Sequence, residues 1–201
     1  MDTASTYSVG FRVDYPERPL DRLTTLFRIF TVIPIAVILG LLSGGSSQQM
    51  AAAGGIITLP TLLMLLFRQK YPRWWFDWNL AFTSFSYRVS VYILLLRDEY
   101  PSTDEEQAVH LSIPYPDAQQ LNRWLPLVKW LLAIPHYVVL FFLTLAVIVC
   151  VVIAWFAILF TGVYPRGLFD FVVGVLRWFV RVTAYAFILT TDEYPPFRLS
   201  D

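Results

Sequence analysis

The sequence predicts an all-α membrane protein with a minor β cap, organised as two tandem homologous halves. The first observation is composition: 57% of the residues are apolar and only 15% are charged, against roughly 45–50% and about 25% in soluble domains. The second is a pair of segments, 29–67 and 130–165, without Asp, Glu, Lys or Arg; a spanning helix needs only about 20 apolar residues. The third is a set of recurring motifs. The formal net charge is zero, so no overall field favours nucleic acid as a partner.

The recurring motifs define the two halves. Tyr-Pro-Arg at 71–73 recurs 93 positions later at 164–166, and Asp-Glu-Tyr-Pro at 98–101 recurs 94 positions later at 192–195. Further matches, at offsets of 93 or 101, are Tyr92 with Tyr185, Arg22 with Arg123, Arg28 with Lys129, and Pro34 with Pro135. A shared register of this kind indicates an internal repeat. We therefore expect a first repeat over residues 1–101 and a second over residues 102–201.

Each half is expected to open with a short strand, over residues 8–14 and 108–114. In both segments apolar residues alternate with polar or small ones, which is the period of a half-buried strand. Related strands in related halves could pair with one another. The pair would then form a small sheet that caps the helices.

A hydrophobic helical hairpin is expected next in each half. In the first half the polar run 43–49 has a turn-forming composition and separates arms over residues 26–42 and 51–67. The second half has no such polar loop, so arms over residues 127–143 and 144–160 require a very tight or deeply placed turn. One long helix kinked at Pro135 is the alternative.

Each half is expected to close with an amphipathic helix, over residues 74–96 and 168–190. Asp170, Arg177 and Arg181 are spaced i, i+7 and i+11, which aligns them on one stripe of a helix. Asp77 and Arg88 occupy the corresponding positions in the first half. Such a helix can lie in the headgroup layer, or it can span the membrane with its stripe toward a partner helix.

The distribution of basic residues favours interfacial third helices. The hairpin tips are uncharged, whereas the hairpin ends carry Lys and Arg, which mark the cytoplasmic side of a membrane. If the third helices spanned the membrane, the second half would be inverted and its basic ends would face outward. We therefore expect a multi-pass protein with four membrane-embedded arms and both termini in the cytoplasm.

The second half resembles a known family of bacterial membrane proteins. The resemblance rests on four runs, LVKWLLAIPHY at 127–137, WFAILFTG at 155–162, YPRGLFDF at 164–171 and DEYPPF at 192–197. They are similar to the family catalogued as domain of unknown function 4389. The first half looks like a diverged second copy, which keeps only the Tyr-Pro-Arg and Asp-Glu-Tyr-Pro motifs. The resemblance implies a bacterial inner-membrane location, and it implies no activity.

Few residues in the sequence point to catalytic chemistry. It has no His-Glu-x-x-His, Gly-x-Ser-x-Gly, Walker or dinucleotide-binding motif. Its one cysteine, Cys150, allows neither an internal disulfide nor a thiolate metal cluster. His136 follows Pro135 in an apolar arm, where a hydrogen-bonded structural role is the leading interpretation and a proton-sensitive role is the alternative. We expect a protein that is not an enzyme and that binds no metal or cofactor.

These observations favour a non-enzymatic integral membrane scaffold or accessory subunit that organises lipid and other membrane-protein subunits, or that self-associates. A membrane-shaping hairpin protein and an oligomeric channel or transporter are the alternatives. The expected binding residues are those of the charged stripe, Arg177, Arg181, Asp170, Arg88 and Asp77. Arg177 and Arg181 lie one turn apart and could hold an anionic lipid headgroup or an acidic partner.

Overall fold

The computed structural model describes residues 7–42, 47–103, 105 and 107–200. The chain is mostly helical with one small sheet. Its elements are β1 (Gly10–Val13), α1 (Arg22–Leu42), α2 (Ser47–Arg68), α3 (Arg73–Ile93), β2 (Val109–Ser112), α4 (Pro126–Leu132), α5 (Ile134–Thr161), α6 (Arg166–Thr183) and the π-helical turn η1 (Ala184–Ile188). Within the described residues, three helical segments are long and apolar enough to cross a membrane, by length and composition: Arg22–Gly40, Ile134–Thr161 and Arg166–Ile188.

The two strands pair with each other, as the alternation predicts. They are antiparallel, and Phe11 lies opposite Leu111 while Val13 lies opposite Val109. Phe11, Val13 and Val109 are buried, whereas Arg12 and His110 on the other face are exposed. The sheet therefore has one core face and one polar face, which is the usual division in a small antiparallel sheet.

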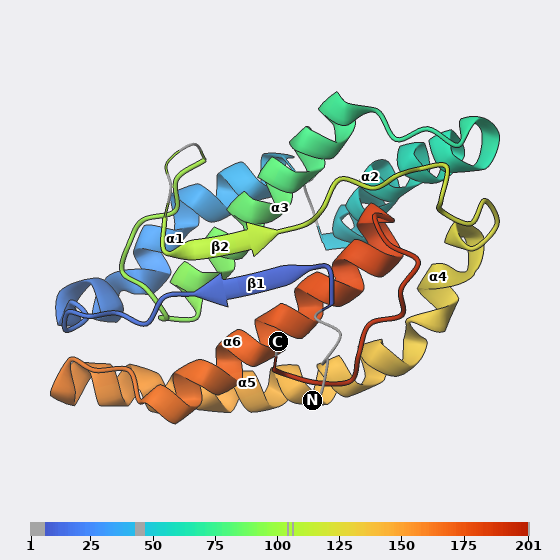
Figure 1. Cartoon of the computed structure of the whole chain (residues 1–201). Helices are drawn as coiled ribbons and strands as arrows, with labels where there is room; N and C mark the ends of the chain where they lie inside the picture. Colours follow the sequence, from blue (N-terminus) through green and yellow to red (C-terminus); the bar gives the residue numbers. More distant parts are fainter. Residues whose placement is uncertain (1–6, 43–46, 104, 106, 201) are drawn as a thin grey trace.

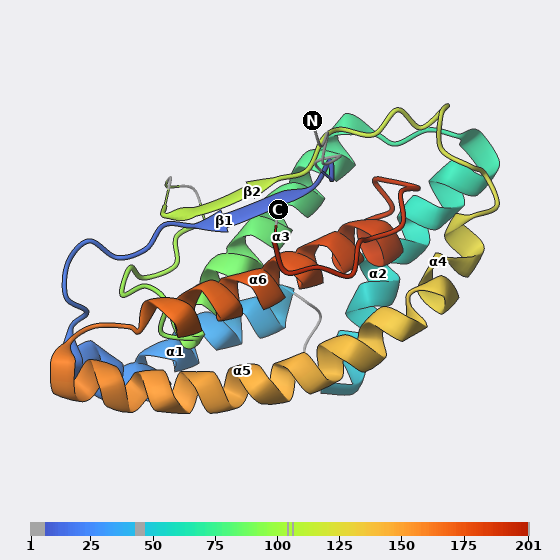
Figure 2. The ribbon, with the colours of Figure 1, turned by 60° about the horizontal axis from the view of Figure 1, so that its bottom comes forward.

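The elements form three layers, which Figures 1 and 2 show from two directions. The sheet packs on α3 through β2 and on α6 through β1. On the opposite side, α1 packs on α3 and α5 packs on α6, while α2 and α4 pack on η1. The innermost layer is thus α3 and α6, between the sheet and the long apolar helices.

The second half contains one long helix where two arms, 127–143 and 144–160, are expected. α5 is continuous over 28 residues, and Figure 2 shows it bowed along the edge of the molecule with α6 on its inner side. Residues 138–160 contain no Gly, Pro or Asn to start a turn, and a turn there would leave backbone groups without partners. The expected alternative, a long helix kinked at Pro135, describes the structure. α4 ends at Leu132 and α5 begins at Ile134, since a proline has no N–H to donate to the preceding turn.

In the first half, two helices cover the expected arms, but they do not pack as a simple pair. α1 packs on α3 and α5, whereas α2 packs on η1 and α4. Figure 1 shows α1 and α2 following one another along the length of the molecule. The connecting residues 43–46 lie outside the described part of the chain.

The third helix of the second half lies inside the molecule rather than at its surface. Most of α6 is buried between the sheet and α5. Gly174 is required by this packing, because a Cβ at that position would lie 2.9 Å from the Cβ of Leu199. The sequence pattern of α6 favours a helix at the membrane interface. In the structure, the sheet and the C-terminal segment cover its charged stripe instead.

Candidate functional site

Two arginines of the charged stripe of α6 bind β1 and the C-terminal segment. Arg177 donates from Nε to the carbonyl oxygen of Phe11 at 2.9 Å and from Nη1 to that of Leu199 at 2.7 Å. Arg181, which is 1% exposed, donates to the carbonyl oxygens of Arg198 at 3.2 Å and Ser200 at 2.8 Å. The two guanidinium groups therefore tie the C-terminal segment to α6, and Arg177 also ties β1 to this helix.

The other members of the predicted stripe lie apart from these arginines. Asp77 is exposed and pairs with Arg73 at 3.3 Å. Arg88 donates from Nη1 to the carbonyl oxygen of Ser102 at 2.8 Å. Asp170 is exposed, and within the described residues no ion pair joins it to Arg177 or Arg181. Of the five predicted residues, the structure therefore brings together only the two arginines of α6.

His136 occupies a closed aromatic box. Its Nδ1 accepts a hydrogen bond from the indole Nε1 of Trp178 at 3.1 Å. The imidazole stacks on Phe197, with ring centroids 4.1 Å apart and planes inclined by 19°, and lies 4.8 Å from the ring of Tyr194. The side chain is fully buried. The imidazole is thus held by one hydrogen bond and by ring contacts.

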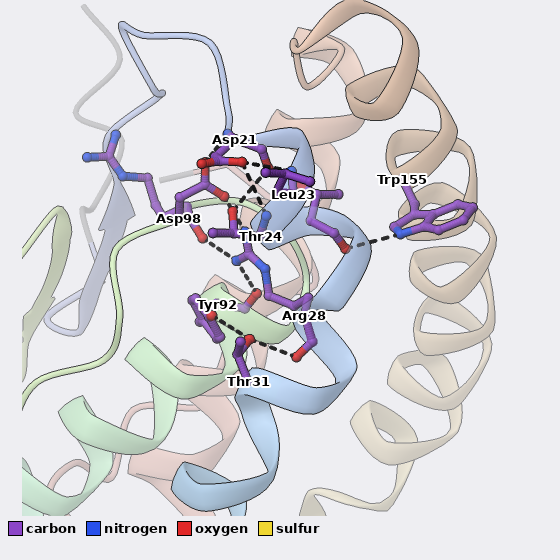
Figure 3. A network of polar contacts seen from close by, with 10 residues as sticks. Asp21, Leu23, Thr24, Arg28, Thr31, Tyr92, Asp98 and Trp155 are labelled. Carbon is purple, nitrogen blue, oxygen red and sulfur yellow. Dashed lines mark hydrogen bonds and ion pairs between the residues drawn. The ribbon is translucent and has the colours of Figure 1, made fainter.

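A buried cation missed by the sequence interpretation lies in the first half. Arg28 of α1 is 3% exposed and forms an ion pair with Asp98, as Figure 3 shows. It also donates to the carbonyl oxygens of Tyr92 at 2.9 Å and Arg97 at 2.6 Å. The guanidinium carbon lies 4.1 Å from the centre of the Tyr92 ring. The second Asp98 oxygen accepts the backbone N–H of Asp21 at 2.6 Å, so both carboxylate oxygens have donors.

The second half contains the same arrangement with a lysine. Lys129 of α4 is fully buried and its Nζ lies 2.7 Å from Asp192. It donates to the carbonyl oxygen of Thr191 at 2.6 Å and lies 5.2 Å from the centre of the Tyr185 ring. Asp192 also accepts the backbone N–H of Asn122 at 2.6 Å. In both halves the anion is the Asp of the Asp-Glu-Tyr-Pro motif, which is the signal that could have revealed these pairs.

Two tyrosines link the halves reciprocally. The hydroxyl of Tyr15 donates to the carbonyl oxygen of Tyr164 at 2.6 Å. The hydroxyl of Tyr115 donates to the carbonyl oxygen of Tyr71. Each acceptor is the first residue of a Tyr-Pro-Arg motif. A contact from the first half to the second is thus matched by one from the second half to the first.

A set of exposed apolar side chains forms a surface that we call the outer apolar face. It is carried by the helices on the side of the molecule away from the sheet. Its members are Leu23, Leu26, Phe27, Ile29, Phe30, Ile33, Val37, Ile38, Leu59, Leu63, Phe67, Leu127, Val128, Trp130, Leu131, Leu132, Ile134, Val138, Phe141, Phe142, Leu145, Ile148, Val149, Val152, Ile153, Phe156 and Phe160.

On α5 this face occupies one side of the helix. At 100° per residue, the exposed positions fall within an arc of about 140°, whereas the buried positions, such as Leu140, Val147 and Ala154, lie opposite. Soluble monomers rarely expose contiguous apolar patches of more than a few hundred Å². The outer apolar face is therefore the candidate interface of this molecule.

Basic residues flank the outer apolar face at both ends of the molecule, and we call them the basic rim. The rim consists of Arg22, Arg68, Lys70, Arg123 and Arg166, all of which are exposed. They lie at the start of α1, at and just after the end of α2, before α4 and at the start of α6. No group of three metal-ligating side chains occurs in the described part of the chain. The geometry thus defines a helical protein with an apolar base, a charged rim and a polar cap.

A comparison with known families finds a match within the second half of the chain. Residues 124–198 match the model of a family described as a domain of unknown function (DUF4389), which supports the resemblance noted in the sequence. The matched segment runs from the start of α4 to the C-terminal segment bound by Arg177 and Arg181, and it contains the Lys129–Asp192 pair. No curated protein and no solved structure matches the chain.

Proposed function

We propose that this protein is a non-enzymatic scaffold of the bacterial inner membrane, embedded through its outer apolar face and presenting its sheet and loops to partners in the cytoplasm. The observation that carries the proposal is the one-sided exposure of large apolar side chains on α1, α2, α4 and α5. Burial of each would contribute about 1.5–3 kcal/mol. A few of them therefore exceed the anchoring strength of a single myristoyl chain, whose binding constant is about 10⁴ M⁻¹.

The matched contacts support a tandem repeat with both halves in the same orientation. Phe11 lies opposite Leu111 in the antiparallel sheet, and the two strands open the two proposed repeats. We infer a pseudo-two-fold axis. It passes between these two residues, is perpendicular to the sheet and points toward the apolar base. The equivalent ion pairs of Arg28 and Lys129 and the reciprocal tyrosine contacts fit the same axis. Such an axis is parallel to the membrane normal, as expected for parallel repeats.

The basic rim supports the orientation. Lys and Arg close to membrane segments mark the cytoplasmic side, and they also attract anionic headgroups at about 1 kcal/mol each. With the rim on the cytoplasmic side, the sheet and the C-terminal segment are cytoplasmic as well.

Accessibility of introduced cysteines tests this proposal. In a Cys150→Ala chain, Ser102→Cys and Ser200→Cys should react with a membrane-impermeant maleimide in inverted inner-membrane vesicles and stay unreacted in spheroplasts. Val149→Cys, which lies on the outer apolar face, should react only after detergent is added. Reaction of the Ser200→Cys protein in spheroplasts would overturn the orientation, and reaction of Val149→Cys in intact vesicles would overturn the embedding.

A membrane-shaping activity is the second candidate, and the bowed form of α5 favours it (Figure 2). α5 is about 42 Å long at 1.5 Å per residue, longer than the roughly 30 Å hydrocarbon core. A bowed helix with apolar residues on one side can fill one leaflet instead of crossing both. Unequal filling of the two leaflets would bend the bilayer.

A further inference from the structure

A lined cavity separates α3 from α6. It has a volume of about 440 Å³, and its walls include Ser86 and Tyr87 of α3 and Leu176, Phe179 and Thr183 of α6. A volume of this size is typical of small-molecule sites, which range over about 300–1,000 Å³. The ring of Phe11 lies 5.3 Å from that of Tyr87, so β1 lies beside the cavity.

A second cavity continues the first. It has a volume of about 220 Å³ and shares Ser90, Leu176 and Phe179 with the larger cavity. It extends along the helices to Thr144 and Val147 of α5. We call the two together the α3–α6 groove. The space exists because small residues of α3 face α6: Ser86 and Ser90 are one turn apart and both line it.

The chemistry of the groove is that of an apolar ligand. Among the described residues, no charged side chain lines either cavity. The hydroxyls of Ser86 and Ser90 donate within α3, to the carbonyl oxygens of Phe82 at 2.8 Å and Ser86 at 2.9 Å. They are therefore satisfied and need no polar group from a ligand. In the larger cavity the hydroxyls of Tyr87 and Thr183 lie 3.5 Å apart, and Thr83 also lines it.

The groove is continuous with the outer apolar face. Thr144 lines its far end, and it lies one helical turn from Phe141 and Ile148 on α5, which belong to that face. The lining residues Ile93 and Phe187 are themselves 44% and 36% exposed. A chain that enters from the surroundings of α5 thus meets apolar surface throughout.

We propose that the α3–α6 groove holds one acyl chain of a phospholipid drawn from the surrounding bilayer. The long, uncharged shape fits an alkyl chain, and the Tyr87–Thr183 hydroxyls can donate to a single ester oxygen. The inference rests on the proposed membrane embedding, because the lipid reaches the groove across the outer apolar face. It adds a specific lipid site to a surface that otherwise contacts lipid non-specifically.

Photo-crosslinking tests the site. The full chain is reconstituted into vesicles of phosphatidylethanolamine and phosphatidylglycerol that contain a phosphatidylcholine with a diazirine near the end of one acyl chain. Irradiation and peptide mass mapping then locate the adducts. The unchanged protein should carry adducts on Leu176 or Phe179 in the groove and also on Phe141 and Phe142 of the outer apolar face.

The decisive variant is Ser86→Trp, which fills the larger cavity, and the matched control is Ala81→Trp at an exposed position of the same helix. Groove adducts should fall about tenfold or more in the Ser86→Trp protein and stay unchanged in the control. Adducts on α5 should be equal in all three proteins. Ser90→Phe provides a second, smaller filling if Ser86→Trp fails to fold.

The outcomes separate the two proposals. If α5 is labelled but the groove is not, or if groove adducts persist in a folded filled variant, the acyl-chain site is wrong while the membrane embedding stands. If α5 is unlabelled in every protein, the embedding itself is wrong.

Discussion

Asp98 in the first half and Asp192 in the second half make the same kind of stabilising contact. Each joins a buried cation to a backbone N–H far away in the sequence. Removing one partner of a buried ion pair leaves an uncompensated charge, which costs about 3–5 kcal/mol. The Asp of each Asp-Glu-Tyr-Pro motif thus has a structural role.

Asp192→Ala should therefore lower the free energy of unfolding by about 3 kcal/mol, because Lys129 would stay buried without its anion. Denaturant titration in detergent measures this. Asp77→Ala is the control, since its exposed pair with Arg73 is worth about 0–1 kcal/mol. Equal losses in the two variants would contradict the importance of the buried pair.

Arg177 and Arg181 give a prediction that separates an internal role from lipid binding. The double change Arg177→Gln with Arg181→Gln removes charge-assisted hydrogen bonds worth about 1.5–3 kcal/mol each. Hydrogen exchange of backbone N–H groups within residues 196–200 should accelerate. The segment is released from α6 when its carbonyl oxygens lose these donors. Co-purified anionic lipid should stay constant.

A fall in bound anionic lipid with unchanged exchange at 196–200 would instead favour the headgroup site expected from the sequence. Arg12→Gln serves as the control for charge alone, because Arg12 is exposed on the polar face of the sheet.

At the scale of elements, local patterns predict the strands well and the helix ends poorly. The alternation around Phe11 and Leu111 is local, and the proposed repeat predicts which strands pair. The turn expected within residues 127–160 does not form. Its prediction is based on membrane thickness and not on a helix-breaking residue. Pro34 and Pro135 are matched in the repeat, yet α1 continues past Pro34 while α4 ends before Pro135. Local sequence does not distinguish these two prolines.

The candidate site was hardest to predict where partners are distant in sequence. In the sequence, Arg28 and Lys129 lie at the ends of apolar segments, where basic residues indicate the membrane topology. The fold instead buries both against aspartates more than sixty positions away. Arg177 and Arg181 read as a surface stripe, whereas the C-terminal segment folds over them. Periodicity defines a face of a helix, but only the tertiary fold defines what covers it.

The sheet has a pH-dependent contact between its strands. Asp14 accepts a hydrogen bond from Nε2 of His110 at 2.9 Å, and this bond lowers the pKa of the Asp14 carboxyl below its ordinary value. A lowered folded-state pKa stabilises the sheet above the unfolded pKa of about 3.9, and the stabilisation is lost as pH falls through the folded value.

His110→Ala should accordingly raise the pKa of Asp14 toward its ordinary value, as measured by NMR titration of the carboxyl carbon. Hydrogen exchange in β1 should become less sensitive to acid below about pH 4. An unchanged Asp14 titration in the His110→Ala protein would show that the cross-strand bond does not form.

At the scale of the whole molecule, the apolar base should act on bilayers as well as bind to them. Purified protein should tubulate liposomes if α5 fills one leaflet. Val149→Lys places a charge in the middle of the outer apolar face, at a cost of about 2.5–3.5 kcal/mol if that position lies at the bilayer centre. Both vesicle flotation and tubulation should decline.

Ser112→Lys on the polar side of the sheet should leave both unchanged, since Ser112 is exposed there. Electron microscopy and flotation read out the two effects. If the Val149→Lys protein still tubulates liposomes and floats with vesicles as the unchanged protein does, embedding through this face is contradicted.

The reciprocal contacts of Tyr15 and Tyr115 have an evolutionary consequence. If the halves descend from one duplicated gene, an ancestral chain of half the length had no partner strand of its own. Its strand could pair only with that of a second copy, and its tyrosine could reach only the Tyr-Pro-Arg segment of that copy. Under such a descent the ancestor would be a homodimer, and its subunit interface would have become the interior of a single protein.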